Sequence, residues 1–304
     1  MFDLIRSNLF LMKKSRSTYI MTIIAIATTA ITILSNALLI ALLHEPADDN
    51  DDENGVSVTM TAEYDEDEDY GDEEDADMTG AVGTLMNAAQ KNSYSAADIL
   101  TMMTSGMNLL LPLSIYIVIF ANSDSKNGYI KNLGGCVARR KIVLAKLICS
   151  AVYTVFAMLI SWGVSMAIAK AVIESKCKVD VVFGSGEDFA KALGVQLLSH
   201  ITIAAVIIMV IMITRSTAVS IAFGVALSSG IPTLLYQVAD MVLHKYVDIS
   251  DDFSIADYVP SNAITGFSPA QDSDTTTRMI VVCVIYLVIA TAIGIAAMKK
   301  KDIR

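Results

Sequence analysis

The feature that most constrains this chain is a series of six long apolar blocks separated by polar segments. A block of about 20 apolar residues is long enough to cross the hydrocarbon core of a membrane as a helix. In lipid the main-chain N–H and C=O groups need partners within the segment, so such blocks become helices. The chain is also 54% hydrophobic, which is above the usual fraction for a soluble domain. The sequence therefore predicts an all-α integral membrane protein with six transmembrane helices.

The predicted transmembrane helices are joined by segments of very different length. The helices are expected at residues 18–43, 103–122, 144–172, 192–213, 217–243 and 279–298. The segments between them are 44–102, 123–143, 173–191 and 244–278, followed by a tail at 299–304. Residues 1–17 place Phe2, Ile5, Leu9 and Met12 at helical spacing among basic residues. This pattern predicts an amphipathic helix that lies at the membrane surface.

Lys and Arg residues are unevenly divided between the two predicted sides of the membrane. When the N-terminus is placed in the cytoplasm, 15 of the 22 basic residues fall in the inner segments. An excess of Lys and Arg is typical of cytoplasmic loops. We therefore expect a multi-pass protein of the cytoplasmic membrane with both termini and the loop 123–143 inside the cell.

The first outer loop is strongly acidic, with 17 Asp and Glu residues and no Lys or Arg between residues 45 and 77. They outweigh the net charge of −10 for the whole chain, so the remainder is net basic. Such a run repels itself and predicts a largely disordered segment. It is either a solvated spacer or a surface that attracts cations or cationic peptides. The candidate cation-attracting residues are Glu63, Asp65, Glu66, Asp67, Glu68, Asp69, Asp72, Glu73, Glu74, Asp75 and Asp77.

The sequence lacks the motifs of common catalytic and metal sites. It has no G-x-x-x-x-G-K-[ST] motif for binding ATP, no H-E-x-x-H zinc helix and no C-x-x-C pair. The acidic run also lacks the regular spacing of a calcium-binding loop. We expect a chain that is not an enzyme, with no directly bound cofactor, no metal site and no nucleic-acid partner.

Three residues within the predicted helices are candidates for a substrate pathway. Gln196 and His200 lie on one side of the fourth helix. Polar residues are costly in lipid and usually face protein or a water-filled cavity, so the pair either bonds to another helix or faces a substrate. Pro232 follows Gly230 in the fifth helix and is expected to kink it, because proline removes a main-chain hydrogen bond.

A basic, glycine-interrupted segment, SDSKNGYIKNLGGCVARRKIVLAK, joins the second and third predicted helices at residues 123–146. Asn127-Gly128 marks a turn, and YIKNL is long enough for about one helical turn. The segment resembles the cytoplasmic loop of ABC-2-type transporter permeases. The matching residues are Asn127, Gly128, Ile130, Lys131, Leu133, Arg139, Lys141, Ile142, Leu144 and Lys146. Ala138 departs from the pattern, since serine is common there. The surface helix, the six-helix count and the ending KKKDIR also fit.

This resemblance implies a mechanism in which the chain is one part of a larger assembly. In the family, two six-span permeases, identical or homologous, join two ATPase subunits that hold ATP and Mg²⁺. The short helix between the second and third spans docks on the ATPase, and closure of the ATPases tilts the spans in the lipid bilayer. The residues to which this coupling role carries over are Asn127, Gly128, Tyr129, Ile130, Lys131, Leu133 and Arg139.

Two functions follow from these features. The first is a permease subunit that moves a substrate with ATP hydrolysed elsewhere; related permeases export peptides, lipids, polysaccharides or drugs, and some protect against antimicrobial peptides. The acidic outer loop favours a cationic peptide as the substrate, and a drug or a lipid-like molecule are the other candidates. The alternative is a non-transporting receptor or sensor whose acidic loop captures cations or cationic peptides. An ATPase partner with a P-loop would distinguish them.

The predicted topology places Cys136 inside the cell and Cys177 outside. A membrane-impermeant thiol reagent applied to intact cells is expected to label Cys177 and to leave Cys136 unlabelled. Permeabilised cells provide the control, because Cys136 then becomes reachable. Labelling of Cys136 in intact cells would overturn both the orientation and the coupling role of the loop.

Overall fold

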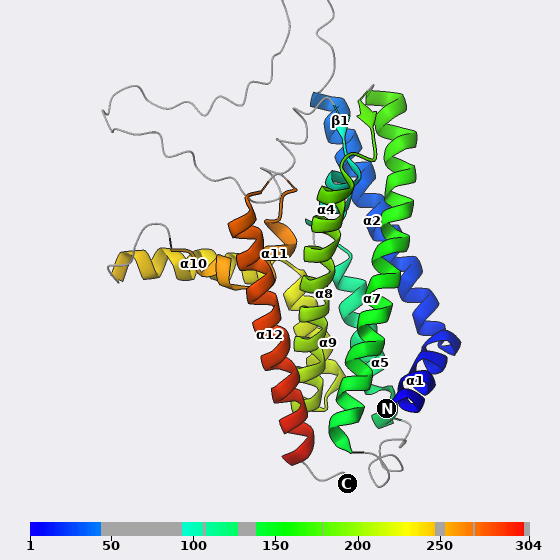
Figure 1. Cartoon of the computed structure of the whole chain (residues 1–304), viewed down its shortest axis with the longest axis vertical. Helices are drawn as coiled ribbons and strands as arrows, with labels where there is room; N and C mark the ends of the chain where they lie inside the picture. Colours follow the sequence, from blue (N-terminus) through cyan, green and yellow to red (C-terminus); the bar gives the residue numbers. More distant parts are fainter. Residues whose placement is uncertain are drawn as a thin grey trace, which may run out of the picture.

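Long helices run side by side and form one bundle, drawn in Figure 1. The structure is a computed structural model, and it describes residues 1–43, 93–105, 108–126, 138–177, 179–246, 253–269 and 271–300. The first helix and the last turn of the last helix lie at the same end of the bundle, which we call the lower end (Figure 1). The opposite end is the upper end.

The described elements are almost all helical. The helices are α1 (Phe2–Lys14), α2 (Arg16–Leu43), α4 (Ala96–Ser105), α5 (Leu110–Lys126), α7 (Arg139–Ala169), α8 (Gly186–Thr214), α9 (Thr217–Ser228), α10 (Ile231–Tyr246), α11 (Asn262–Thr265) and α12 (Ser273–Lys300). A π-helix, η1 (Lys170–Cys177), continues α7, and a 3-10 helix, η2 (Ile255–Tyr258), precedes α11. Two short strands, β1 (Ser93–Tyr94) and β2 (Asp180–Val181), pair in parallel with Ser93 opposite Asp180.

Four of the described helices are long and apolar enough to cross a membrane: α2, α7 with its extension, α8 and α12. The bent pair α9 and α10 makes a fifth candidate, and α5 is a shorter apolar helix. The most apolar stretches of α7 and α8 are each 56% buried, against 22% for α2 and 28% for α12. α7 and α8 are therefore the centre of the bundle. The all-α membrane class is confirmed, and the number of six spans stays a prediction.

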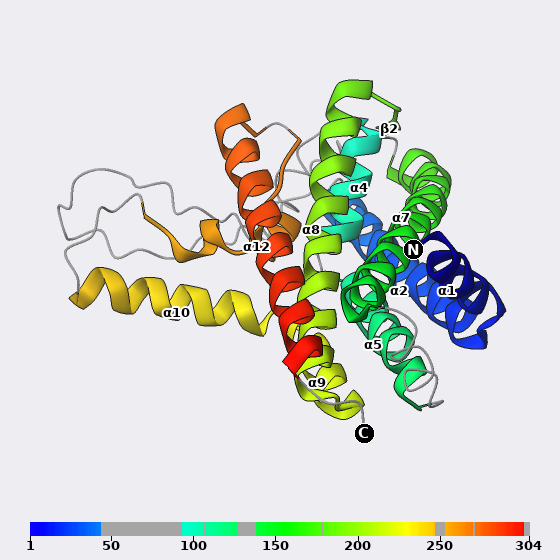
Figure 2. The same ribbon diagram turned by 60° about the horizontal axis from the view of Figure 1, so that its bottom comes forward.

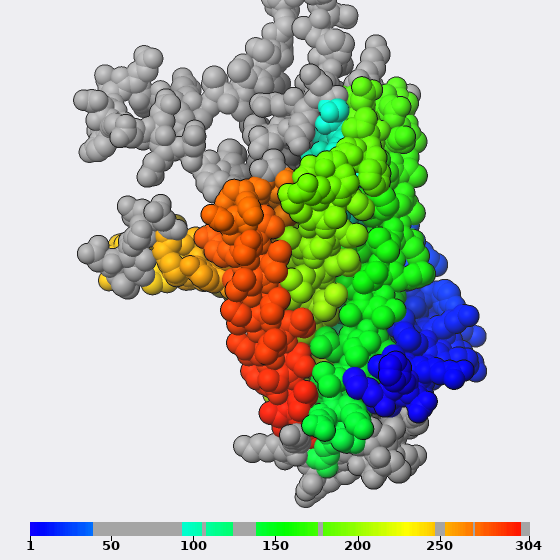
Figure 3. Space-filling view, viewed as in Figure 1, coloured from blue at the N-terminus to red at the C-terminus, as the bar shows by residue number. Residues whose placement is uncertain are grey.

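α8 packs along α12 on one side and along α7 on the other, and all three reach one face in the space-filling view (Figure 3). α5 lies against α9 and α8, and α2 lies against α7. α1 turns away from α2 at Ser15 and packs on α7.

The second span predicted at 103–122 corresponds to parts of two helices in the structure, and its role as one span stays a prediction. α4 ends at Ser105 and α5 begins at Leu110. Between them, the side chain of Asn108 donates to the hydroxyl of Thr32 at 2.7 Å, and its main-chain oxygen accepts from the hydroxyl of Thr28 at 3.3 Å. Asparagine favours turns because its short polar side chain competes with the helical main chain. Here α2 supplies the partners.

Other helix limits also differ from the predicted ones. α8 begins at Gly186, six residues before the predicted start at 192, because Ser185 caps it. The Ser185 hydroxyl accepts from the amides of Glu187 at 3.2 Å and Asp188 at 3.5 Å. These acidic residues also suit the positive end of the helix dipole. α7 begins at Arg139 rather than at 144. The predicted loop 173–191 therefore contains helix ends and the strand β2.

The predicted kink in the fifth span is confirmed and is large. α9 and α10 meet at an angle of 65° across Ser229 and Gly230. Gly230 has a φ of +75°, a conformation that other residues adopt only with strain. Pro232 lies buried in the first turn of α10, where its missing N–H would have no helical partner in any case. α10 consequently leaves the bundle sideways in both views (Figures 1 and 2).

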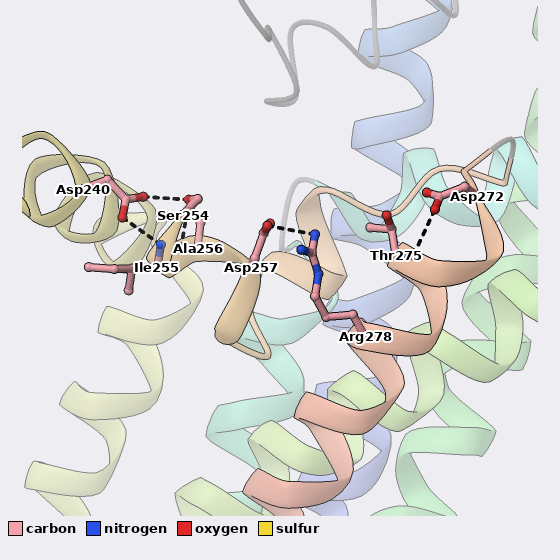
Figure 4. A network of polar contacts seen from close by, with 8 residues as sticks. All are labelled: Asp240, Ser254, Ile255, Ala256, Asp257, Asp272, Thr275 and Arg278. Carbon is pink, nitrogen blue, oxygen red and sulfur yellow. Dashed lines mark hydrogen bonds and ion pairs between the residues drawn. The ribbon is translucent and has the colours of Figure 1, made fainter. Parts of the chain in front are cut away.

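α10 is amphipathic, and a polar network braces its inner side (Figure 4). The carboxylate of Asp240 accepts from the hydroxyl of Ser254 and from the amide of Ile255, both at 2.7 Å. These bonds hold η2 against α10. An ion pair of 2.8 Å between Arg278 and Asp257 then joins η2 to α12. The apolar residues exposed on the other side are Ile231, Leu234, Leu235, Val238, Met241 and Val242.

The upper end of α12 has its own cap. Asp272 accepts from the amide of Thr275 at 3.2 Å (Figure 4). Hydrogen bonds from the side chain and main chain of Thr275 lower the pKa of Asp272. A depressed carboxyl pKa means that the cap stabilises the fold at neutral pH and is lost only as the pH falls through that lowered pKa.

Replacing Asp240 with alanine is expected to release η2 from α10, because the hydroxyl of Ser254 and the amide of Ile255 both lose their acceptor. Hydrogen bonds to a charged group contribute about 1.5–3 kcal/mol each when shielded, so the main-chain amides of residues 253–258 should exchange with solvent about tenfold faster or more. Hydrogen exchange followed by mass spectrometry measures this. The exposed Asp274→Ala variant is the control; equal exchange in both variants contradicts the bracing role.

Candidate functional site

The predicted site residues fall into described and undescribed parts of the chain. Arg139, Gln196, His200 and Pro232 are described. The coupling residues Asn127, Gly128, Tyr129, Ile130, Lys131 and Leu133 lie outside the described residues, as do the eleven acidic candidates between Glu63 and Asp77. What the structure shows of the predicted coupling site is therefore its two attachments, the end of α5 and the start of α7. Both lie at the lower end (Figure 1).

Lys146 is the most informative residue near these attachments. It lies two turns into α7 and its side chain is fully buried. Its Nζ donates to the main-chain oxygen of Phe120 in α5 at 3.1 Å and lies 4.8 Å from the centre of the Phe120 ring. A cation over an aromatic face is attracted by the ring's electron density. The ammonium group of α7 thus binds α5 through both the main chain and the side chain of one residue.

Arg139 makes a corresponding contact to another helix. Its guanidinium donates to the main-chain oxygen of Met298 in the last turns of α12 at 3.2 Å. Arg139 and Lys146 are seven residues apart, which is two turns of helix and about 10 Å. One side of the first two turns of α7 therefore binds both α12 and α5.

The end of α5 is also bonded to α9. The side-chain amide of Asn122 donates to the hydroxyl of Thr217, the first residue of α9. Gly224 of α9 packs so closely on Ser114 of α5 that an added Cβ would lie 3.1 Å from the Ser114 Cβ. Small residues at such positions let two membrane helices approach closely. α5 and α9 consequently contact each other as a tightly fitted pair.

A tyrosine layer joins α2 to the same region. The rings of Tyr116 in α5 and Tyr153 in α7 have centroids 3.8 Å apart. The hydroxyl of Thr18 donates to Tyr116 at 3.3 Å, and that of Thr22 lies 3.1 Å from the hydroxyl of Tyr153. Polar groups therefore connect α2, α5, α7, α9 and α12 in the lower half of the bundle.

A second polar group lies on α8. The side-chain amide of Gln196 donates to the main-chain oxygens of Ala263 at 3.4 Å and Ile264 at 3.2 Å. These carbonyls belong to α11, a single helical turn whose C-terminal carbonyls have no helical partners. Of the two roles expected for Gln196, bonding to another element is therefore observed.

His200 is fully buried one turn further along α8. Its Nδ1 lies 2.7 Å from the main-chain oxygen of Gln196, and because that oxygen can only accept, Nδ1 carries the proton. In the neutral ring Nε2 is then an acceptor. Among the described residues, neither Nε2 of His200 nor Oε1 of Gln196 has a hydrogen-bond partner. The substrate-facing role of His200 stays a prediction.

The described residues contain no group of three or more His, Cys, Asp or Glu side chains placed to hold a metal ion. Among the described residues, the polar side chains buried in the bundle are instead amides, hydroxyls, the imidazole of His200 and the ammonium of Lys146. Such groups bind and position other chemical groups. The geometry therefore fits binding and mechanical connection.

A comparison with known families decides the identity. The sequence profile of the ABC-2 family transporter proteins matches residues 78–230, which is half of the chain. The chain belongs to this family. It is therefore the membrane permease of an ABC transporter and not the ATPase itself. A comparison with curated proteins found none that matches.

The matched region of the permease covers α4, α5, α7, α8 and α9 and ends at Gly230, at the break between α9 and α10. It includes both attachments of the loop and the contacts of Lys146. The sequence had indicated Lys146 only as a basic residue and a motif match. The sequence signal for its buried position is a lysine between Ala145 and Leu147, inside the predicted span 144–172. Ionisable residues inside membrane spans usually face protein and are commonly functional.

Gln196→Leu is expected to destabilise the permease, because it leaves the carbonyls of Ala263 and Ile264 without their donor in a dry interior. A buried polar group that loses its partner costs about 1–3 kcal/mol. Thermal unfolding followed by the fluorescence of Trp162, the only tryptophan of the chain, should show a lower midpoint. The exposed Gln237→Leu change is the control. An unchanged midpoint in Gln196→Leu would refute the bonding role.

Proposed function

We propose that this permease exports a substrate across the cytoplasmic membrane with energy from ATP hydrolysed by a separate subunit. The family match carries the proposal. The docking segment is residues 128–133, between α5 and α7. ATP and Mg²⁺ are held by that partner, since the chain has no P-loop motif of its own.

The lower end is the cytoplasmic end in this proposal. The start of α7, α1 and the last turn of α12 share that end (Figure 1). The basic residues there are Lys13, Lys14, Arg139, Arg140, Lys141, Lys299 and Lys300. This concentration agrees with the preference of Lys and Arg for the cytoplasmic side. The α4–α5 pair and the α9–α10 pair then count as the second and fifth spans, which gives six crossings and both termini inside.

The assembly contains a second permease, either identical or homologous, and two ATPase subunits. α7 is the element best placed to receive force from the docked ATPase, because it begins directly after the loop and runs through the centre of the bundle. Motion of α7 is passed on as tilting of the neighbouring spans.

The substrate is a cationic peptide, a drug or a lipid-like molecule. The acidic outer loop supports the cationic peptide, because charges of one sign raise the local concentration of oppositely charged molecules near the membrane. His200 and Gln196 contribute two buried acceptors within the bundle. A substrate with ammonium or amide hydrogens has the donors that such acceptors need.

The decisive experiment is co-purification. Tagged permease, extracted from its native membrane in mild detergent, is expected to bring down a subunit with a P-loop that hydrolyses ATP. Recovery of the permease without any ATPase, under conditions in which a known ABC complex remains intact, contradicts the proposal and supports the receptor.

The docking segment can be tested with a charge placed on its apolar side. Ile130→Asp together with Leu133→Asp should leave membrane insertion unchanged but reduce ATPase association about tenfold or more, because a buried carboxylate is costly to desolvate. Asn132→Asp adds charge to the same segment at a polar position and is the matched control. Association is measured as the ratio of ATPase to permease after purification. Equal ratios for the double variant and the wild type would exclude docking at 128–133.

A further inference from the structure

Lys146 has a position that the need for correct membrane orientation does not explain. A lysine that only orients a loop lies exposed at the membrane surface, as Lys141 does in the same helix. Lys146 instead has no exposed surface at all. A buried ammonium is strongly disfavoured unless its hydrogen-bond and charge partners are well placed. The protein therefore retains a costly group at a point where α7 meets α5.

Two contacts of Lys146 go to one residue of a neighbouring helix, Phe120 of α5. Its Nζ binds both the main-chain oxygen and the ring face of Phe120. A bond to the main chain holds the helix itself and not only a side chain. The last turn of α5 begins at Ser123, three residues after Phe120. The loop that follows α5 begins at residue 127.

The same loop is followed by α7, so the loop and Lys146 both connect α5 with α7. The loop leaves α5 at Lys126 and enters α7 at Arg139. Lys146 then joins these two helices to each other directly. A force on the loop therefore reaches both helices together and does not separate them.

From α5 the contacts continue to the bent span. Asn122, two residues after Phe120, bonds to Thr217 at the start of α9. α9 is a rigid helix that ends at the break beside Gly230. The order of contacts is thus the loop, α7, Lys146, α5, Asn122 and α9. Arg139 provides a parallel contact from α7 to α12.

We propose that Lys146 is the positioning residue through which movement of the loop 127–138 is transmitted from α7 to α5, and from α5 to the broken span α9–α10. The inference rests on the proposed function, in which an ATPase docks on this loop. Docking itself belongs to residues 128–133 and does not require Lys146. Transmission does, because the ammonium ties α7 to the main chain of α5, whereas the ring contact of Tyr153 with Tyr116 fixes no hydrogen bond between the two helices.

The test uses the permease–ATPase complex reconstituted in lipid nanodiscs. Lys146→Met, which keeps the length of the side chain and removes the charge, is compared with Lys146→Arg, which keeps a cation. Lys141→Met removes an exposed charge from the same end of α7 and is the matched control. Three quantities are measured: the ratio of ATPase to permease, the KM for ATP and the permease-dependent part of kcat.

Lys146→Met is expected to keep the wild-type subunit ratio and KM while losing about tenfold or more of the permease-dependent kcat, the equivalent of one charge-assisted hydrogen bond. Lys146→Arg should recover most of it, and Lys141→Met should behave as the wild type. Wild-type kcat in a folded Lys146→Met complex overturns the proposal. An equal loss of the permease-dependent kcat in Lys141→Met also overturns the proposal. Absence of ATPase from the wild-type preparation would instead contradict the proposed function.

A second variant covers the case in which Lys146→Met fails to fold. Phe120→Leu removes the ring beneath the ammonium and keeps the main-chain acceptor, so folding is retained and the permease-dependent kcat should fall by a smaller factor. Hydrogen exchange in residues 120–126 should rise in the same variant. If exchange rises while kcat is unchanged, Lys146 has only a structural role and the proposal is wrong.

Discussion

The need to pair every main-chain polar group within the chain governs this structure, because hydrocarbon offers no partners. The long helices meet that need by themselves. Many hydroxyl side chains follow the same rule: Thr29, Thr104 and Thr154 each donate to the carbonyl one turn earlier, all at 2.9 Å. Such residues add polarity without requiring another helix. Longer side chains, such as Lys146 and Gln196, reach across to a neighbour, and these are the places where the helices are held in register.

The break between α9 and α10 shows how the chain interrupts a helix while keeping several main-chain hydrogen bonds. The amide of Ser229 donates to the oxygen of Ala226 at 3.4 Å. The oxygen of Gly230 accepts from the amides of Thr233 at 3.0 Å and Leu234 at 3.4 Å, which starts α10 at once. Pro232 occupies a position where no donor is needed. The 65° bend therefore costs few hydrogen bonds and is stable enough to direct α10 out of the bundle. Asp240 and Arg278 then fix the following segment.

Sequence reasoning predicted what depends on local composition. Apolar blocks predicted most helices, and the pair Gly230 and Pro232 predicted the bend, because both signals act within a few residues. It failed where distant residues decide. The predicted second span is divided between α4 and α5, where Asn108 bonds to Thr32 of α2, which lies 76 residues away in the sequence. The strand pair β1–β2 joins residues 93 and 180. The role of Lys146 likewise depends on Phe120, and no local pattern indicates which carbonyl a lysine will reach.

The basic residues that begin α7 divide into two groups when their exposure is considered. Arg140 and Lys141 are exposed at the lower end and are free to interact with lipid headgroups or water, which is what orientation in the membrane requires. Arg139 and Lys146 point into the bundle and bind the carbonyls of Met298 and Phe120. Charge near a membrane surface orients a chain wherever it lies, but only a charge with a fixed partner transmits displacement. The same short basic segment therefore carries both exposed charges and, in the proposed transmission, charges with fixed partners, because its residues lie on two sides of one helix.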